Sequence, residues 1–344
     1  MKSFIFFISF IFLGLCGCKQ PSTKVVEHGF YYWKTEFKLS SDEKQSLEKL
    51  NVTKLYIRFF DVVYDTQIGP IARQPIVFID KVPDNINVVP VVFITNETIL
   101  QMDSNKIPVL AGHITRSVNT MAKNNLKSAA KEIQIDCDWS VSTKEKYFKL
   151  LREIRDSLTD KKCIVSVTIR LYQAKYQTLT GIPPVSRGTL MVYNMGQLTN
   201  PATTNSIMDI AEEKKYLTVL EKYPLKLDVV LPIFYWGVLF RDTRFAGILN
   251  NLDEKTLKDN VAFRKEEANN YRASYETQLN NYSILNGDRI RLESCTEKDM
   301  EESISLISSK NKTDTLCLSF FSLDSQLINS SRNEKISQYY SDYR

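Results

Sequence analysis

The chain has 344 residues, of which 45 are basic and 40 acidic, so its formal net charge is +5. A content of 43% hydrophobic and 25% charged residues is typical of a folded globular protein. The basic residues are scattered and are interleaved with acids, as in RKEE at 264–267. A nucleic-acid surface is therefore not expected.

The first eighteen residues predict a targeting signal. Lys2 is followed by an apolar run from Phe4 to Leu15 and then by small residues. The segment LCGC at 15–18 resembles the bacterial lipobox, in which the final cysteine, here Cys18, is acylated and becomes the mature N-terminus. The alternatives are an ordinary secretory signal or a transmembrane anchor, although the run is shorter than the roughly 20 residues of a spanning helix. We expect a palmitate-bearing lipoprotein anchored in the membrane of the cell envelope, most simply the outer membrane.

After a polar tether at residues 19–27, the sequence shows β-rich apolar segments separated by helical or turn-forming stretches. Several of these, such as VVPVVFIT at 88–95, are nearly continuous apolar runs, which is typical of parallel strands buried on both faces. Eight strands are predicted, at Phe30–Phe37, Lys54–Asp61, Val88–Thr95, Glu132–Trp139, Cys163–Leu171, Thr189–Met195, Leu227–Trp236 and Thr315–Ser322.

Helical patterns fit between most of these strands. They cover Ser41–Leu50, Val109–Asn124 and Glu297–Ser309, and another helix begins after strand four at a capping box of Ser142 and Glu145. Eight strands with crossovers predict a (β/α)8 TIM barrel, whose active site lies at the C-terminal strand ends. An open doubly wound sheet is the alternative, but no glycine-rich phosphate turn follows the first strand.

The connection between strands seven and eight is nearly 80 residues long. It contains a polar stretch near 251–282 that we expect to be helical, and a short alternating strand at Arg289–Glu293. We interpret about 238–295 as an insertion beside the mouth of a single barrel domain that spans 28–344. No internal repeat or second full domain is expected.

The chain contains few of the residues that several common kinds of catalysis and metal binding require. Its two histidines, His28 and His113, leave little basis for serine–histidine catalysis or a histidine metal site, and nucleotide-binding glycine loops are absent. No metal or cofactor is therefore expected. Four cysteines outside the signal can be buried thiols or form disulfides, such as one between the last two: Cys137, Cys163, Cys295 and Cys317.

Acidic, basic and aromatic residues gather instead at the predicted strand ends. Asp136 and Asp138 are two residues apart on one strand, so their side chains point to the same face. If that face is the barrel lumen, their mutual repulsion raises the pKa of one carboxyl, which suits acid–base chemistry on a sugar. Alternatively, Arg58 and Arg170 neutralise the two acids in a structural network. The residues expected to bind substrate are Arg58, Asp61, Trp139, Arg170, Tyr193, Asn194, Tyr235 and Trp236.

The segment IQIDCDWS at 133–140 resembles the strand-four signature of glycoside hydrolase family 18, the chitinase-like barrels, which reads Asp-x-x-Asp-x-Asp-x-Glu. Asp136 and Asp138 match the second and third acids of that signature. Ile133 stands in place of the first acid, and Ser140 stands in place of the catalytic glutamate.

Three further segments resemble the same family in the expected order. LMVYN at 190–194 is similar to the strand-six Met-x-Tyr-Asp, with Asn194 replacing the aspartate. LPIFYWG at 231–237 resembles Leu-Pro-Phe-Tyr-Gly of strand seven, and FFSLDS at 320–325 resembles Phe-Trp-Ser-Leu-Asp of strand eight, with Phe321 replacing the tryptophan. The resemblance also implies an insertion between strands seven and eight.

In that family the glutamate protonates the glycosidic oxygen, and the neighbouring aspartate positions the acetamido group that attacks the sugar. The resemblance implies that Asp138 and Tyr193 assist this step, whereas the hydroxyl of Ser140 is too weak an acid. One hypothesis is therefore a glycan-acting enzyme that uses Asp136 and Asp138, with Asp61 as a further carboxylate. The second is a lapsed hydrolase that binds a glycan or a protein, and the third is an assembly lipoprotein for which the barrel is a scaffold.

The chain as a whole also resembles a group of exported bacterial barrel lipoproteins, with TIRLYQAKYQTLTGIPP at 168–184 as a shared kind of segment. The expected partners are an oligosaccharide and, through the N-terminal lipid, a membrane. The sequence predicts no oligomeric state.

Overall fold

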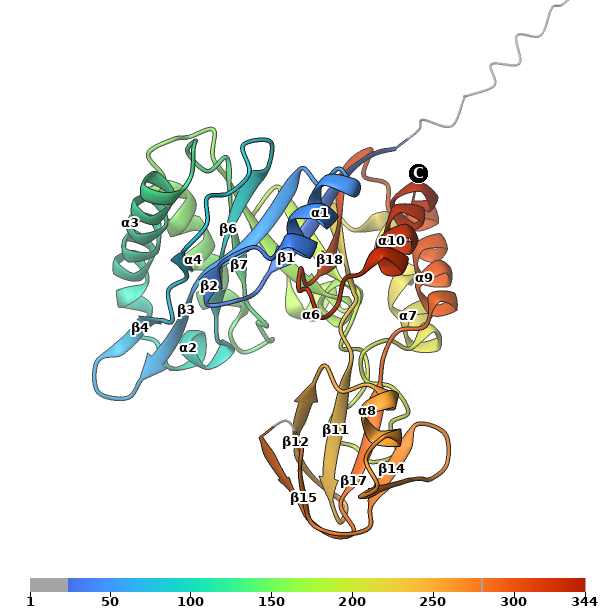
Figure 1. The fold of residues 1–344 in the computed structure, drawn as a ribbon. Helices are drawn as coiled ribbons and strands as arrows, with labels where there is room; N and C mark the ends of the chain where they lie inside the picture. Colours follow the sequence, from blue (N-terminus) through green and yellow to red (C-terminus); the bar gives the residue numbers. More distant parts are fainter. Residues whose placement is uncertain (1–23, 280, 344) are drawn as a thin grey trace, which may run out of the picture.

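Eight parallel strands close into a barrel in the computed structural model, which describes residues 24–279 and 281–343 (Figure 1). The predicted signal segment and Cys18 lie outside the described residues. The barrel order is β1-β18-β10-β9-β8-β7-β6-β3, and β3 pairs with β1 to close the ring, which confirms the predicted TIM barrel. The strands are β1 (Val25–Tyr32), β3 (Lys54–Asp65), β6 (Asn87–Ile94), β7 (Glu132–Asp136), β8 (Ile164–Arg170), β9 (Arg187–Met191), β10 (Lys226–Pro232) and β18 (Thr315–Phe321).

Each predicted strand corresponds to a barrel strand, but several boundaries are displaced. The first strand is shifted toward the N-terminus, because Val25 pairs with Thr315 of β18 at the start of the strand. His28 lies inside β1, where its ring stacks on Tyr340 at 3.8 Å, and its polarity hid the strand pattern. The fourth and seventh strands end early, at Asp136 and at Pro232.

Helices cover the outside of the barrel, as Figure 1 shows. The second crossover carries no helix, because β3 turns into the antiparallel β4 (Gly69–Arg73), followed by β5 (Val77–Phe78), which pairs with β2 (Glu36–Phe37). The longer helices are α1 (Ser41–Lys49), α3 (Ile107–Asn125), α4 (Lys144–Ser157), α7 (Ile210–Tyr216), α9 (Glu297–Lys310) and α10 (Ser330–Asp342); α2 (Asn96–Gln101), α5 (Leu171–Lys175) and α6 (Gln177–Thr180) are shorter. None of the described helices is long and apolar enough to cross a membrane.

The predicted capping box at the start of α4 is wrong. The cap residue is Thr143, which forms no side-chain capping bond, and Ser142 bonds to the hydroxyl of Ser140 at 2.9 Å instead. Reciprocal capping boxes occur at the starts of α1 and α9, where Ser40 and Thr296 are the cap residues.

The insertion between β10 and β18 forms an antiparallel sheet of order β12-β11-β17-β14-β13, which projects from the barrel in Figure 1. The predicted helical stretch near 251–282 is wrong, since among its described residues only the five of α8 (Glu254–Lys258) are α-helical. Buried residues such as Leu249, Tyr271 and Ile290 give this sheet its own core, although polar neighbours conceal the pattern. Its strands are β11 (Trp236–Arg241), β12 (Arg244–Asn250), β13 (Phe263–Lys265), β14 (Asn270–Ala273) and β17 (Arg289–Glu293), with the hairpin of β15 (Thr277–Leu279) and β16 (Tyr282–Ile284) beside them.

The barrel lumen is packed at its middle. Tyr31 and Tyr56 stack there with ring centroids 4.6 Å apart, among buried Val91, Met191 and Val230. This layer separates the C-terminal mouth of the barrel from its N-terminal mouth.

The four cysteines among the described residues are free thiols, so the disulfide considered between Cys295 and Cys317 is not formed.

A buried ion pair ties the insertion to the loop that follows β9. Arg291 and Glu293 are 1% and 0% exposed, and Nε of the arginine lies 2.6 Å from Oε1 of the glutamate. Arg291 also donates to the carbonyls of Leu198 and Asn200, at 3.1 and 2.8 Å. The second oxygen of Glu293 accepts the indole N–H of Trp236 at 2.9 Å. One charged pair thus holds the loop that follows β9 and the ring of Trp236 against the insertion.

We expect Arg291→Ala to lower the free energy of unfolding by about 3 kcal/mol, because it leaves the carboxylate of Glu293 buried without its cation. Thermal and denaturant unfolding, followed by tryptophan fluorescence, measure this loss. Arg244→Ala is the matched control, since the side chain of Arg244 in the same insertion is 83% exposed and its pair with Asp242 spans 3.9 Å. Equal stability of the two variants would contradict the prediction.

Candidate functional site

A cavity of about 700 Å³ opens at the C-terminal mouth of the barrel. It contains most of the predicted site residues: Arg58, Asp61, Asp136, Asp138, Arg170, Tyr193, Asn194, Tyr235 and Trp236. Its size is that of an ordinary small-ligand pocket, and its position is the usual one for the active site of a (β/α)8 barrel.

Asp138 is held by a bidentate ion pair. β7 ends at Asp136, and Asp138 lies two residues further on, so both side chains reach the same cavity, as the strand period predicts. The guanidinium of Arg170, at the end of β8, donates through Nη2 to Oδ2 of Asp138 at 2.5 Å and through Nε to Oδ1. A fork-to-fork pair of this kind fixes the position of the carboxylate and neutralises its charge.

Asp136 has no cation of its own. Its Oδ1 accepts a hydrogen bond of 2.5 Å from the hydroxyl of Thr168 on β8. Burial raises the pKa of Asp136 to about 7, the charges of Asp138 and Asp61 add to the increase, and Arg170 opposes it. The pKa of one of the two carboxyls is thus raised, as predicted, but the main cause is burial rather than the expected repulsion between the two acids. Asp136 therefore exchanges a proton near neutral pH.

The predicted neutralising network is half present. Arg170 does pair with Asp138, but Arg58 pairs with Asp61 rather than with Asp136. Nε and Nη2 of Arg58 lie 2.7 and 2.6 Å from the two oxygens of Asp61, and Nη2 also reaches Oε1 of Gln74 at 3.0 Å. The arginines thus leave Asp136 as the unpaired acid of the three.

Aromatic rings form one side of the cavity. Phe234 lies 5.0 Å from Trp236 and 6.0 Å from Phe321, and Tyr193 lies 5.7 Å from Phe321, measured between ring centroids. Trp33 joins the same cluster at 5.5 Å from Phe321. Burial raises the pKa of Tyr193, so its hydroxyl stays protonated, and it donates to the sulfur of Met191 at 3.3 Å. Flat apolar faces beside carboxylates and amides suit a ligand with both C–H and O–H surfaces.

Trp139 does not line the cavity, in contrast to the prediction. Its side chain is 2% exposed, its indole donates to the carbonyl of Thr180 at 2.9 Å, and its ring stacks on Tyr147 of α4 at 5.3 Å. Adjacent residues of an extended chain point to opposite sides, so Trp139 faces the helices when Asp138 faces the mouth.

Ser140 lies in the turn that begins α4. Its amide donates to the hydroxyl of Thr143 at 2.8 Å, and its own hydroxyl bonds to that of Ser142. It is not part of the cavity lining, and no glutamate belongs to that lining within the described residues. The position that carries the proton donor in the family 18 signature is thus occupied here by a helix-start turn.

The sequence missed part of the lining. Trp33 falls inside the predicted first strand, whereas β1 ends at Tyr32 and leaves Trp33 at the mouth. Gln74 follows the unpredicted hairpin, in the left-handed conformation with φ of 47°. Asn250 and Asn251 come from the insertion, where a turn-forming asparagine pair after an apolar run was the available signal. Further lining residues are Thr35, Phe93, Met191, Phe234, Phe321, Ser322, Asp324 and Leu327.

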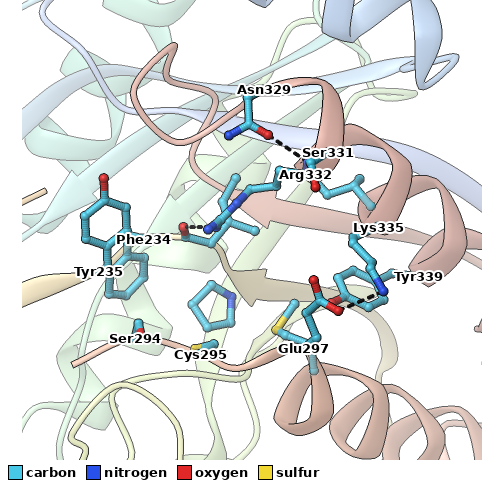
Figure 2. A pocket seen from close by; sticks show the side chains of 14 residues that line it. Phe234, Tyr235, Ser294, Cys295, Glu297, Asn329, Ser331, Arg332, Lys335 and Tyr339 are labelled. Atoms are coloured by element: carbon cyan, nitrogen blue, oxygen red, sulfur yellow. Dashed lines mark hydrogen bonds and ion pairs between the residues drawn. The ribbon is translucent and has the colours of Figure 1, made fainter. Parts of the chain in front are cut away.

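A smaller cavity of about 210 Å³ lies between the end of β10 and the first turns of α9 and α10 (Figure 2). It shares Phe234 and Tyr235 with the larger cavity. Its cations are engaged, since Arg332 donates to the carbonyl of Ile233 at 2.7 Å and Lys335 pairs with Glu297 at 2.8 Å. Burial raises the pKa of the Cys295 thiol there, which keeps it in the unreactive protonated form. These contacts fix the segment that carries Phe234 and Tyr235 into the larger cavity.

The described residues contain no group of three or more histidine, cysteine, aspartate or glutamate side chains placed to hold a metal ion.

Comparisons with known proteins agree on the fold. No family model matches the chain, and no curated protein matches its sequence. A putative chitinase domain from Desulfitobacterium hafniense DCB-2 superposes with a TM-score of 0.58 at 10% identity, covering 94% of this chain and 100% of that one. The chitinase of Chromobacterium violaceum gives 0.55 at 10% identity, with 92% and 99% coverage. The spore cortex-lytic enzyme SleL of Bacillus cereus gives 0.55 at 14% identity, with 93% and 75% coverage. The chain therefore has the fold of the chitinase-like (β/α)8 barrels.

We expect Asp136→Asn to remove a pH-dependent loss of stability. Folded Asp136 keeps its proton up to about pH 7, whereas an unfolded aspartate releases it near pH 4, so the wild-type protein loses stability as the pH rises through this window. Relative to wild type, the variant should gain on the order of 2 kcal/mol between about pH 4 and pH 7.5.

Thermal unfolding across this pH range measures the gain. Asp156→Asn, at an exposed position on α4, is the control and should give a constant difference from wild type. Parallel curves for Asp136→Asn and wild type would show that Asp136 does not keep its proton in the folded state.

Proposed function

We propose that the protein binds a glycan in the cavity at the C-terminal mouth. The observation that carries this proposal is the two-sided lining, in which aromatic faces lie opposite a fixed set of carboxylates, guanidinium groups and amides. Sugar rings present C–H faces that stack on aromatic rings and hydroxyls that hydrogen-bond to such planar groups. The likeness in fold to chitinases and to a cortex-lytic enzyme supports the same class of ligand.

Binding is favoured over hydrolysis by the usual family route. That route needs a carboxylic acid at position 140, where the chain has Ser140 in a turn outside the cavity. It also needs a carboxylate that positions the acetamido group, whereas both oxygens of Asp138 are engaged by Arg170. The cavity thus keeps the residues that recognise a sugar and lacks the usual proton donor.

Hydrolysis by an altered route is the second candidate function, and one observation favours it. Asp136 has a pKa of about 7, which is the property of a general acid that works at neutral pH. In this route Asp136 protonates the leaving oxygen, and the carboxylate of Asp138 or Asp61 stabilises the developing positive charge. A water then adds to the sugar carbon and returns a proton to Asp136.

A panel of soluble oligosaccharides, including N-acetylglucosamine oligomers and peptidoglycan fragments, tests both functions on the chain that begins at Lys19. We expect binding without turnover. Trp236→Ala should weaken binding about tenfold because it removes a stacking face, and Asp138→Asn should weaken it by a similar factor. Tyr275→Ala, at an exposed position outside the cavity, should leave affinity unchanged.

Each result separates the candidates. Turnover that disappears in Asp136→Asn establishes the altered hydrolase. Binding that is equally strong in Trp236→Ala and in wild type removes the cavity from the proposal, and no binding across the panel favours a scaffold.

We further propose that the mature protein is anchored in the membrane of the cell envelope through a lipid on Cys18. The support is the order of a charged start, an apolar run and the segment LCGC at 15–18 in the sequence. Labelled palmitate should enter the wild-type protein in a bacterial host and sediment with membranes. Cys18→Ser should abolish labelling, whereas Cys16→Ser should retain it. Equal labelling of Cys18→Ser would place the lipid elsewhere.

A further inference from the structure

We propose a second ligand site at the N-terminal mouth of the barrel, which takes a small primary ammonium compound that also carries an anionic group. A cavity of about 660 Å³ opens there, at the end of the barrel opposite the glycan cavity. The charged side chains that line it are Glu27, Lys54, Asp84, Lys127, Lys131, Glu132 and Arg187. This site is independent of the glycan-binding proposal.

The two cavities share the same strands but not the same space. Glu132, Gln134 and Asp136 are spaced two residues apart along β7, so their side chains form one inward column. This column runs from the N-terminal mouth to the C-terminal mouth. Gln134, in the middle, is fully engaged, because it accepts from the hydroxyl of Tyr31 at 2.7 Å and donates to Thr189 at 2.9 Å. The packed layer of the lumen therefore isolates Glu132 from the cavity at the C-terminal mouth.

Most charged side chains around the cavity at the N-terminal mouth already have partners. Three ion pairs surround it: Lys54 with Glu27 at 2.7 Å, Lys127 with Asp84 at 2.9 Å, and Arg187 with Asp228 at 2.5 Å. The Asp228 carboxylate also accepts the amide of Cys317 and the hydroxyl of Tyr56. Within the part of the chain that the structure describes, this pairing leaves two charged side chains of the lining without an ion pair of their own, Lys131 and Glu132, although the charges of Lys54 and Arg187 act on Glu132 from a distance.

Glu132 has the features of a ligand-binding group rather than of a structural acid. It is only 7% exposed, yet its Oε1 has no hydrogen-bond partner, and the nearby buried hydroxyl of Ser166 also has none. A buried carboxyl oxygen without a donor costs about 1–3 kcal/mol. Burial raises the pKa of Glu132, and the charges of Lys54 and Arg187, whose own ion pairs are with Glu27 and Asp228, oppose this increase.

The missing partner is defined by the arrangement of these two side chains. A primary ammonium offers three N–H donors for Oε1 of Glu132 and a positive charge in direct contact with its carboxylate. The exposed ammonium of Lys131 at the rim matches an anionic group on the same ligand, such as a carboxylate or a phosphate ester. A quaternary ammonium has no N–H donor and cannot satisfy Oε1, so the site distinguishes the two kinds of cation.

Two sources supply this chemistry, a free zwitterion and the head group of an aminophospholipid. β1 begins at Val25 on this face, and Figure 1 shows the chain entering the barrel at the end away from the insertion. An anchor on Cys18 would therefore place the N-terminal mouth toward the membrane and the glycan cavity away from it.

Titration calorimetry on the chain that begins at Lys19 tests the site with O-phosphoethanolamine, with β-alanine and with phosphocholine as the quaternary control. We expect one or both primary amines to bind at least tenfold more tightly than phosphocholine. Glu132→Gln should weaken this binding at least tenfold, and Lys131→Ala should weaken it severalfold. Both variants should retain wild-type glycan affinity and melting behaviour, and Lys131 is exposed, so its replacement keeps the test valid if Glu132→Gln fails to fold.

Vesicles containing phosphatidylethanolamine or only phosphatidylcholine distinguish the sources. Flotation of the same protein with phosphatidylethanolamine vesicles, lost in Lys131→Ala, assigns the site to a lipid head group. Binding of the soluble amines without flotation assigns it to a free zwitterion. Equal binding of O-phosphoethanolamine and phosphocholine, unchanged binding in both variants, or no binding of any probe would overturn the proposal.

Discussion

The closure of the parallel barrel is the constraint on which the rest of the structure depends. β1 pairs with β18 on one side and with β3 on the other, so the first and last barrel strands lie next to each other. Because all eight strands run in the same direction, their C-terminal ends gather at one mouth, and residues as distant in sequence as Trp33 and Asp324 line one cavity. The same closure gathers the N-terminal ends at a second mouth, where Glu132 lies.

Electrostatics then divides three mouth carboxyls, Asp61 of β3, Asp136 at the end of β7 and Asp138 just beyond it, into two kinds. Arg58 and Arg170 hold Asp61 and Asp138 in paired, oriented form, and only Asp136 is left with a hydroxyl as its nearest partner. The arrangement positions hydrogen-bond acceptors around a pocket and leaves one exchangeable proton at neutral pH. It is consistent with recognition of an uncharged polar ligand.

The insertion completes this mouth through the buried Arg291 and Glu293 pair. Glu293 fixes the indole of Trp236, while Arg291 fixes the loop that follows Asn194. The aromatic side of the cavity therefore depends on the carboxylate of Glu293, which does not line the cavity itself. The support for this wall thus lies in β17, the short alternating strand that the sequence predicts at Arg289–Glu293.

The sequence by itself determined the barrel, the order of its strands and the shared direction of Asp136 and Asp138, because strand periodicity and buried apolar runs are local properties. Most of the site residues that it predicted do line one cavity, since the C-terminal strand ends of a closed parallel barrel converge. Only the tertiary structure decided which arginine pairs with which acid, because that choice depends on the register between β3, β7 and β8. It also decided the burial of Trp139 against α4 and the sheet of the insertion, whose polar residues hide its core. Pairing and burial depend on neighbours distant in the chain, which no local pattern contains.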